Sequence, residues 1–381
     1  MSSVDALVDW LIDGAPGATG SAEVVGRVGA ELRASGVPLD RLLGYVTTLH
    51  PSIAGRYFAW SPDNPVLTGE LPHGIMESER FINAPIGKAV LGKAEHRARL
   101  TVEAERSVYP VLMELWGEGY TDYFSAPMLF TTGEAHALTF ATKAADGFSE
   151  ADVVAMRRVI RPLARIGEIL ALRRTATTLL DTYVGRKTGD RILAGRIRRG
   201  DFETMRAVIW FSDLRGFTQL SASASTREVI ETLNRVFDCQ VPSIEKCGGE
   251  VLKFMGDGLL AIFPFADGDD PAKLADRAIE AAEEALAAVA ALEPLRIGLA
   301  LHVGELAYGN IGGEHRLDFT AIGPAVNLTS RLEALTSKLG RPLVVSEELA
   351  RITSRATEEL GTFDLKGIPS PARVFAPKPA R

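Results

Sequence analysis

Two aspartates beside glycines are the residues of this chain best placed to do chemistry. Asp213 follows the apolar run AVIWFS, and Asp257 lies in the turn GDG between two further apolar runs. Carboxylate oxygens are hard ligands of the kind that Mg²⁺ and Mn²⁺ prefer in proteins. The two stretches together predict a site that holds divalent metal against the phosphates of a nucleotide.

A turn suited to phosphate follows the first aspartate. Gly216, Phe217 and Thr218 lead towards an amphipathic segment, which is expected to be a helix over about 225–246. Backbone N–H groups at the start of a helix lack intrahelical partners and bind anions well. We therefore expect the turn to bind phosphate close to the metal.

A strand and a hairpin are expected to position the two aspartates. The β-branched and aromatic run Ala207–Phe211 predicts a buried strand that ends at Asp213. The segment GGEVLKFMGDGLLAIF, from Gly248, predicts a hairpin with Asp257 in its turn and Lys253 on its first strand. A GDG turn alone is commonly structural, so the prediction of a site depends on both stretches occurring together.

These stretches resemble the catalytic domain of the class III nucleotidyl cyclases, the family of adenylate and guanylate cyclases, over about Arg206–Phe375. The resemblance implies an α+β fold with a ferredoxin-like βαββαβ core. It also implies a head-to-tail homodimer with shared active sites, ATP as substrate, and two divalent cations per site, Mg²⁺ or Mn²⁺.

The resemblance assigns roles to residues of the first half of the site. Asp213 and Asp257 match the two metal-binding aspartates, and the carbonyl of Leu214 would complete the metal shell. Lys253 matches the lysine that reads the adenine ring.

A second signature, DFTAIGPAVNLTSRLE, supplies the other half. Asn327 matches the residue that orients the ribose, and Arg331 matches the one that stabilises the transition state. The two are four residues apart on a predicted helix, so they share a face. Lys366, in FDLKG, matches a lysine that contacts the triphosphate.

Thr320 departs from the commonest family pattern, which has aspartate as the second base-reading group. Threonine there resembles the class IIIb subgroup, which includes bicarbonate-responsive members, and its hydroxyl can accept a hydrogen bond from the adenine amino group. Guanine-specific members usually carry glutamate where this chain has Lys253. An adenylate cyclase is therefore favoured, and a guanylate cyclase or a catalytically silent nucleotide or ligand sensor are the alternatives.

The N-terminal half predicts a regulatory domain. Helical periodicity over Val4–Leu43 is followed by strand-rich segments over Tyr45–Asn64 and Tyr120–Thr142, the second of them a hairpin. A long helix begins at FSEADV, with Ser149 as N-cap and Asp152 as its partner. This order resembles a GAF-type sensory domain, which could bind a small-molecule effector.

We expect three parts: a GAF-like domain over 1–170, a helical linker over 171–204 and a cyclase domain over 205–381. The apolar stripe of the helix that begins at FSEADV predicts either packing on its own domain or the seam of a parallel dimer. Pro162 predicts a kink or a break in that helix.

The composition limits which partners and which cellular location we expect. The chain has 381 residues, 46% of them apolar, with 42 basic and 49 acidic residues and a net charge of −7, so binding to nucleic acid is not expected. No signal peptide or membrane span is predicted, and Cys239 and Cys247 fit neither a zinc site nor a disulfide framework; we expect a cytoplasmic protein. The histidines are expected to be ordinary core or surface residues: His50, His73, His96, His136 and His302.

Overall fold

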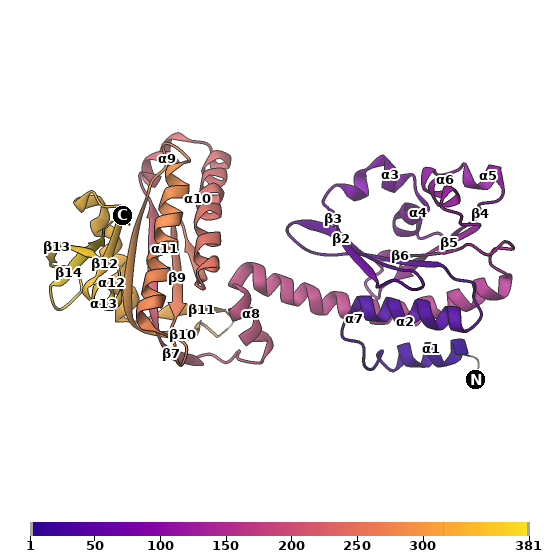
Figure 1. Ribbon diagram of the computed structural model, residues 1–381, viewed down its shortest axis with the longest axis horizontal. Coiled ribbons are helices and arrows are strands. Elements are labelled where there is room, and N and C mark those ends of the chain that lie inside the picture. Colours follow the sequence, from indigo (N-terminus) through magenta and orange to yellow (C-terminus); the bar gives the residue numbers. More distant parts are fainter. Residues whose placement is uncertain (1–2, 315, 379–381) are drawn as a thin grey trace. The chain divides into compact units, whose positions relative to one another are not determined.

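The computed structural model describes residues 3–314 and 316–378, so the last three positions of the expected cyclase domain lie outside the described residues. The chain divides into two compact units, with the division between Leu179 and Leu180. The N-terminal unit holds the elements from α1 to most of α7, and the C-terminal unit holds α8 to β14 (Figure 1).

A six-stranded antiparallel sheet in the order β3-β2-β1-β6-β5-β4 forms the centre of the N-terminal unit. Its strands are β1 (Arg41–Thr47), β2 (Ile53–Trp60), β3 (Leu67–Pro72), β4 (His96–Arg99), β5 (Asp122–Leu129) and β6 (Ala135–Thr142). The hairpin predicted from the sequence is confirmed, because β5 and β6 pair from Asp122↔Thr142 to Leu129↔Ala135.

Helices cover both faces of this sheet (Figure 1). One face packs against α1 (Ser3–Ile12), α2 (Ser21–Ala34) and α7 (Glu150–Val184) through a continuous apolar core. The other face carries short elements over two smaller clusters: η1 (Ile75–Glu77), α3 (Glu79–Ile82), α4 (Pro85–Gly92), α5 (Glu103–Arg106) and α6 (Pro110–Gly117). The resemblance of this unit to a GAF-type domain stays a prediction.

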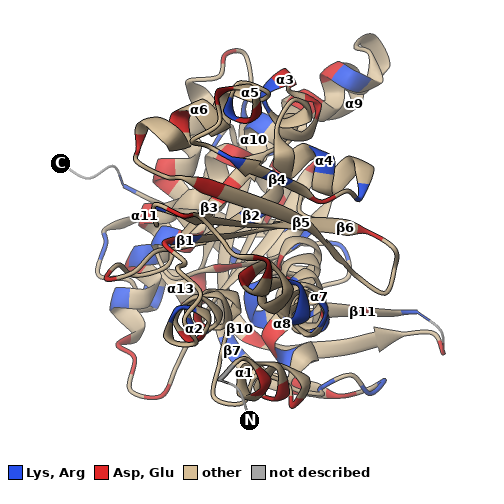
Figure 2. Cartoon of the chain, turned by 90° about the vertical axis from the view of Figure 1, so that its right-hand side faces the viewer, with Lys and Arg blue, Asp and Glu red and all other residues tan. Residues whose placement is uncertain are grey.

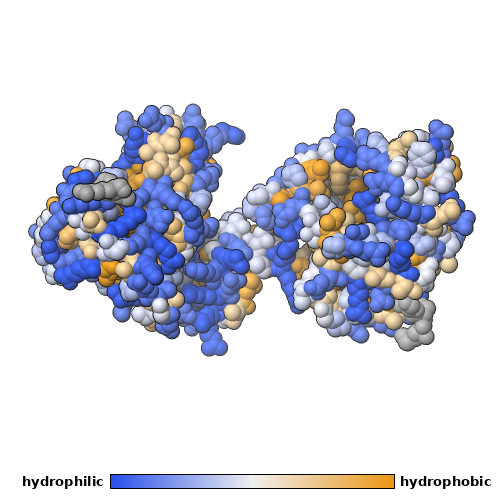
Figure 3. Space-filling view, viewed as in Figure 1, coloured by the Kyte–Doolittle hydropathy of each residue, from blue (hydrophilic) through white to orange (hydrophobic). Residues whose placement is uncertain are grey.

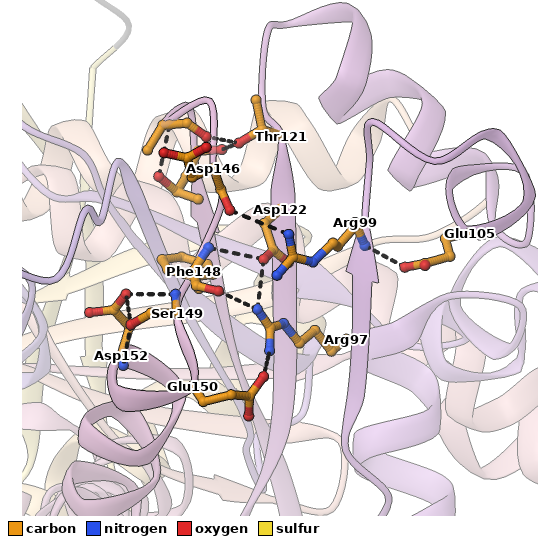
Figure 4. Close-up of polar contacts among 12 residues, drawn as sticks. Arg97, Arg99, Glu105, Thr121, Asp122, Asp146, Phe148, Ser149, Glu150 and Asp152 are labelled. Carbon is orange, nitrogen blue, oxygen red and sulfur yellow. Dashed lines mark hydrogen bonds and ion pairs between the residues drawn. The ribbon is translucent and has the colours of Figure 1, made fainter.

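A polar network fixes the start of α7 against the sheet (Figure 4). The fully buried Asp122 carboxylate accepts hydrogen bonds from the Phe148 N–H and from Arg97, each at 3.0 Å. Arg97 also donates to the Phe148 carbonyl and, at 2.6 Å, to Glu150 in the first turn of α7. Gly147 is required beside this network, since its φ is +68° and a Cβ would lie 2.7 Å from the carboxylate.

The predicted cap of α7 is confirmed, and of the two outcomes predicted at Pro162, a kink or a break, the break does not occur. The Ser149 N–H donates to the Asp152 carboxylate at 2.8 Å, and the Asp152 N–H donates to the Ser149 hydroxyl at 3.2 Å. The helix continues without a break through Pro162. Buried neighbours on both sides, among them Ile160 and Leu163, hold it on the sheet, and tertiary packing outweighs the one lost backbone hydrogen bond.

The C-terminal unit has the predicted βαββαβ order. Its first six major elements are β7 (Phe202–Leu214), α10 (Thr226–Lys246), β8 (Glu250–Met255), β9 (Gly258–Pro264), α11 (Pro271–Ala290) and β10 (Ile297–Gly312). The remaining elements are α8 (Arg186–Leu193), α9 (Phe217–Ser223), β11 (Leu317–Ile322), α12 (Pro324–Leu339), β12 (Leu343–Ser346), α13 (Glu347–Ile352), β13 (Thr357–Phe363) and β14 (Ala372–Pro377). The strand order is β13-β14-β12-β10-β7-β9-β8, and β11 pairs with β10 in an extended hairpin (Figure 2).

The strand β7 is buried on both of its faces. Val208 and Trp210 pack into the core that α10 and α11 cover, while Ala207 and Ile209 pack into the opposite core with residues of β11 and α12. A strand held from both sides and paired with β9 and β10 has little freedom to move. Its last residues, including Asp213, are therefore rigidly placed.

The helix α8 is tied to the sheet of the C-terminal unit by polar contacts. The Thr188 hydroxyl hydrogen-bonds the Tyr308 hydroxyl on β10, and the Lys187 ammonium lies 3.6 Å from the Glu250 carboxylate at the start of β8. The residues expected to form a linker therefore contact the hairpin strand that carries Lys253.

The surface is mixed in charge. Acidic and basic residues alternate along the helices (Figure 2), and hydrophilic residues cover much of the face drawn in Figure 3. Within residues 3–314 and 316–378, no helix has the length and apolar character needed to cross a membrane.

Replacing the buried carboxylate should test the network at the start of α7. We expect Asp122→Ala to lower the free energy of unfolding of the N-terminal unit by about 3 kcal/mol, because Arg97 and the Phe148 N–H lose their acceptor. Chemical denaturation of the full chain measures this. Asp146→Ala is the control, because Asp146 is exposed and accepts from Arg99 through its backbone carbonyl, which the substitution keeps. Equal losses of stability in the two variants would contradict the prediction.

Candidate functional site

The two aspartates singled out by the sequence meet at the end of β7. Asp213 pairs with Gly258 on β9, the residue that follows Asp257 in the hairpin turn. This pairing brings the two carboxyls close together, and burial together with the charge of Asp257 raises the pKa of Asp213 to about 7. Two carboxylates this close repel each other, so one of them holds a proton unless a cation takes its place.

Glycines on both sides of Asp257 allow this approach. Gly256 has a φ of +66°, which other residues rarely adopt. A Cβ on Gly258 would lie 3.2 Å from the Ser212 carbonyl oxygen and 3.4 Å from the Asp213 carboxylate. The turn GDG is thus needed both for its backbone conformation and for its close contact with β7.

The turn after Asp213 has the expected place. Leu214 is the buried last residue of β7, and Gly216, with a φ of +71°, is the N-cap of α9. Phe217 and Thr218 are the first two residues of α9, which no side chain caps. Backbone N–H groups of this turn therefore lie within a few residues of the aspartates, although binding of phosphate here stays a prediction.

An ion pair beside the aspartates was not predicted from the sequence. Arg215 lies 3.3 Å from the carboxylate of Glu333 on α12, which is only 5% exposed. Burial raises the pKa of Glu333, while Arg215 lowers it and the charge of Asp257 adds to the rise. Arg215 is in the stretch FSDLRGF and Glu333 is in NLTSRLE, so their place in the two signatures was the signal that could have indicated a role in the site.

The helix α12 presents different faces to the core and to solvent. Asn327 and Arg331 lie on α12 with the spacing that predicted a shared face. Both are exposed, and within residues 3–314 and 316–378 neither side chain makes a hydrogen bond or ion pair. Glu333, which faces the aspartates, is two residues from Arg331, so the two side chains point about 200° apart around the helix axis. Arg331 therefore points away from Asp213 and Asp257 of its own chain.

Lys253 lies close to the strand that carries Thr320. Its ammonium group pairs with the carboxylate of Asp318 on β11. Because side chains alternate along a strand, Asp318 and Thr320 lie on the same side of β11. The structure thus brings together Lys253 and Thr320, and it adds Asp318, to which the sequence analysis gave no role.

Lys366 is exposed in the loop between β13 and β14 and, within the described ranges, makes no hydrogen bond or ion pair. The buried Leu365 beside it anchors the loop to the core formed with α12.

The donor set around the aspartates fits a hard divalent cation. No cluster of three or more His, Cys, Asp or Glu side chains able to hold a metal occurs within residues 3–314 and 316–378. Asp213 and Asp257 would therefore supply two carboxylates, and backbone carbonyl and phosphate oxygens would supply the rest. His302 does not take part, since it is buried and its Nδ1 lies 2.8 Å from the Ser346 hydroxyl.

Comparison with known proteins finds similarity over the C-terminal unit. Residues 202–375 match the adenylate and guanylate cyclase catalytic domain, and domains of this family are nucleotide cyclases, which are lyases. An adenylate cyclase of Anabaena cylindrica is 30% identical over 161 residues, which cover 41% of this chain and 32% of that protein. An adenylate cyclase of Dictyostelium discoideum is 33% identical over 158 residues, which cover 39% of this chain and 7% of that protein. The chain thus spans a third or less of the length of these two relatives.

Two solved structures are also similar to this chain. The crystal structure of an adenylyl cyclase from P. aeruginosa has a TM-score of 0.44 and 26% identity, covering 48% of this chain and 97% of that one. A guanylyl cyclase structure has a TM-score of 0.40 and 29% identity, covering 47% of this chain and 93% of that one.

The raised pKa of Asp213 predicts a pH-dependent stability in the absence of metal. The pKa of Asp213 is about 7 in the folded chain, whereas its ordinary value is 3.8. A carboxyl with a pKa raised in this way favours folding while it is protonated. This contribution is lost as the pH rises from about 4 to above 7. We expect the melting temperature of the C-terminal unit in EDTA to fall over this range, and Mn²⁺ at pH 8 to restore it.

The variant Asp213→Asn should reduce both the pH-dependent fall and the effect of Mn²⁺. The exposed Asp364 gives a matched control, and Asp364→Asn should behave as the unmodified chain does. Calorimetry at pH 5 and pH 8 measures the difference. An Asp213→Asn profile that superimposes on that of the unmodified chain would show that the aspartate pair does not titrate in this way.

Proposed function

We propose that this protein is an adenylate cyclase, which converts ATP to 3′,5′-cyclic AMP and pyrophosphate in a homodimer under the control of its N-terminal unit. The observation that carries the proposal is the contact between the Asp213 and Asp257 carboxyls, at the end of a rigid strand and within the segment that matches the cyclase catalytic family.

The aspartate pair is the half of the site that binds the triphosphate. Asp213, Asp257 and the Leu214 carbonyl would hold two divalent cations, Mg²⁺ or Mn²⁺. When bound, these ions supply positive charge against the phosphates and lower the pKa of the ribose 3′-hydroxyl. The N–H groups of Gly216, Phe217 and Thr218 then orient the phosphates, so that the 3′-oxygen attacks the α-phosphorus as the bond to pyrophosphate breaks.

The second half of the site comes from the other copy of the chain. Asn327 and Arg331 are exposed and share a face of α12 that points away from the aspartates of the same chain. In a head-to-tail dimer this face can meet the aspartates of the second copy, where Asn327 positions the ribose. Arg331 neutralises the charge that grows on the α-phosphate, and a preorganised cation contributes most at that point. Lys366 contacts the triphosphate.

The adenine ring is read by Lys253 and Thr320. Lys253 is on β8 and Thr320 is on β11, and the ion pair between Lys253 and Asp318 on β11 links the two strands. The Thr320 hydroxyl accepts from the adenine amino group, and the Lys253 ammonium donates to a ring nitrogen. This arrangement favours ATP over GTP.

The direct test is turnover of nucleotide by the full chain. With Mn²⁺ and ATP we expect cyclic AMP and pyrophosphate in equal amounts, measured by chromatography, with a lower kcat/KM for GTP. Lys253→Ala should lower the ratio of kcat/KM for ATP to that for GTP by about tenfold or more, because it removes a group that reads adenine. Lys246→Ala, which removes a lysine at the end of α10 that pairs with Glu284 on α11, should leave the ratio unchanged. If no product forms with every divalent metal tested, the proposed cyclase activity is wrong.

Mixing inactive variants tests the shared site. Asp213→Ala and Arg331→Ala should each be inactive, whereas their equal mixture should regain about a quarter of full activity, since half of the dimers are mixed and each has one intact site. The control mixture of Asp213→Ala with Asp257→Ala should stay inactive, because both aspartates belong to the same half. Equal behaviour of the two mixtures, with subunit exchange verified by mass, would contradict the shared site.

A further inference from the structure

The N-terminal unit contains a cavity of about 670 Å³ between its sheet, α2 and α7. Its inner wall is apolar and includes Val25 on α2, Phe58 on β2, Leu138 on β6 and Leu163 on α7. Cavities of 300–1,000 Å³ with apolar walls and a few polar groups are typical of small-molecule sites. The cavity lies wholly within one compact unit, so its shape depends on that unit alone.

Two glycines in regular elements keep this space open. Gly44 is in the middle of β1, and Gly167 is in the interior of α7. A Cβ would meet Leu138 at 3.5 Å in the first case and Met128 at 3.7 Å in the second, which are ordinary contacts. Neither glycine has a positive φ. Close packing and backbone conformation therefore do not account for these two glycines. Because glycine in a helix interior costs about 1 kcal/mol relative to alanine, their presence needs another reason, and an open cavity supplies one.

The rim of the cavity carries an excess of positive charge. Three arginines contribute to its lining, Arg56 on β2 with Arg173 and Arg174 on α7, against one carboxylate, Glu70. Glu70 is already paired with Arg56 across the β2–β3 ladder. Burial and the neighbouring charge of Arg56 lower the pKa of Arg174, and no acidic residue within the described ranges forms an ion pair with this arginine.

We propose that this cavity binds a small molecule with an apolar body and one anionic group, a carboxylate or a phosphate. The apolar body fills the space left by Gly44 and Gly167, and the anion pairs with Arg174 at the rim. Charged hydrogen bonds from a guanidinium to a carboxylate or phosphate are among the strongest that a protein makes.

The location of the cavity gives its occupant access to α7. Leu163, Gly167, Leu170 and Arg174 all line it, and they follow one another at steps of three and four along the helix. A ligand that fills the space therefore packs against about three turns of α7. The same helix continues to Val184, beyond the division between the units.

Binding to the full chain tests the proposal independently of any cyclase activity. Octanoate, octyl phosphate and octan-1-ol have the same apolar body and differ only in their head group. We expect the two anions to bind by calorimetry with one site per chain, and octan-1-ol to bind at least about tenfold more weakly. The two anionic arms distinguish a carboxylate from a phosphate ligand.

Variants locate the site. Arg174→Gln should remove the preference for anions, whereas Arg161→Gln, on the same helix outside the cavity, should keep it. Gly167→Leu should abolish binding of all three probes, and Gly167→Ala should keep binding. Ala171→Leu, one turn further along the lining, serves if Gly167→Leu fails to fold. The proposal is overturned if no anion binds, if octan-1-ol binds as tightly as octanoate, or if the filled variants bind as the unmodified chain does.

Discussion

The repulsion between two carboxyls is the constraint on which the C-terminal unit depends. Asp213 and Asp257 come from elements far apart in sequence, and only a strand buried on both faces can hold them in contact. Without a cation, burial and the charge of Asp257 raise the pKa of Asp213, so ionisation of both carboxyls is unfavourable and a bound cation would relieve it. The nearby pair of Arg215 and Glu333 brings no net charge to offset it. The site is therefore built to attract a cation.

The same geometry leaves the site incomplete within one chain. The helix α12 contributes Glu333 to the surroundings of the aspartates, and this fixes the rotation of the helix about its axis. Asn327 and Arg331 must then face solvent. A residue needed at the α-phosphate and turned away from its own metal ligands can act only across an interface between copies. Dimerisation in the proposed enzyme thus follows from the orientation of one helix.

The sequence was sufficient where local patterns determine structure. The hairpin turn at Asp257, the cap at Ser149 and the helical face shared by Asn327 and Arg331 all depend on neighbours within a few residues, and all are present. Prediction from the sequence failed where contacts between distant residues determine the structure. Pro162 does not break α7 because buried residues on both sides hold the helix, and the partners of Lys253 and Arg215 lie 65 and 118 positions further on, too far for any local pattern to indicate.

The apolar stripe of α7 answers a question that the sequence left open, because it divides into two parts. Up to Glu168 the helix has buried residues in every turn, packed on its own unit, whereas from Ile169 to Val184 none of its residues is buried. Ile169, Leu172 and Tyr183 are 46%, 61% and 80% exposed. A helical segment of about 15 residues has marginal stability in water on its own. Apolar residues at 169, 172, 176, 179 and 183 follow the three-four spacing of a coiled-coil seam, which a second copy of the chain can cover. The first alternative, packing on the same domain, thus describes the first half of the helix, whereas the dimer seam stays a prediction for the second half.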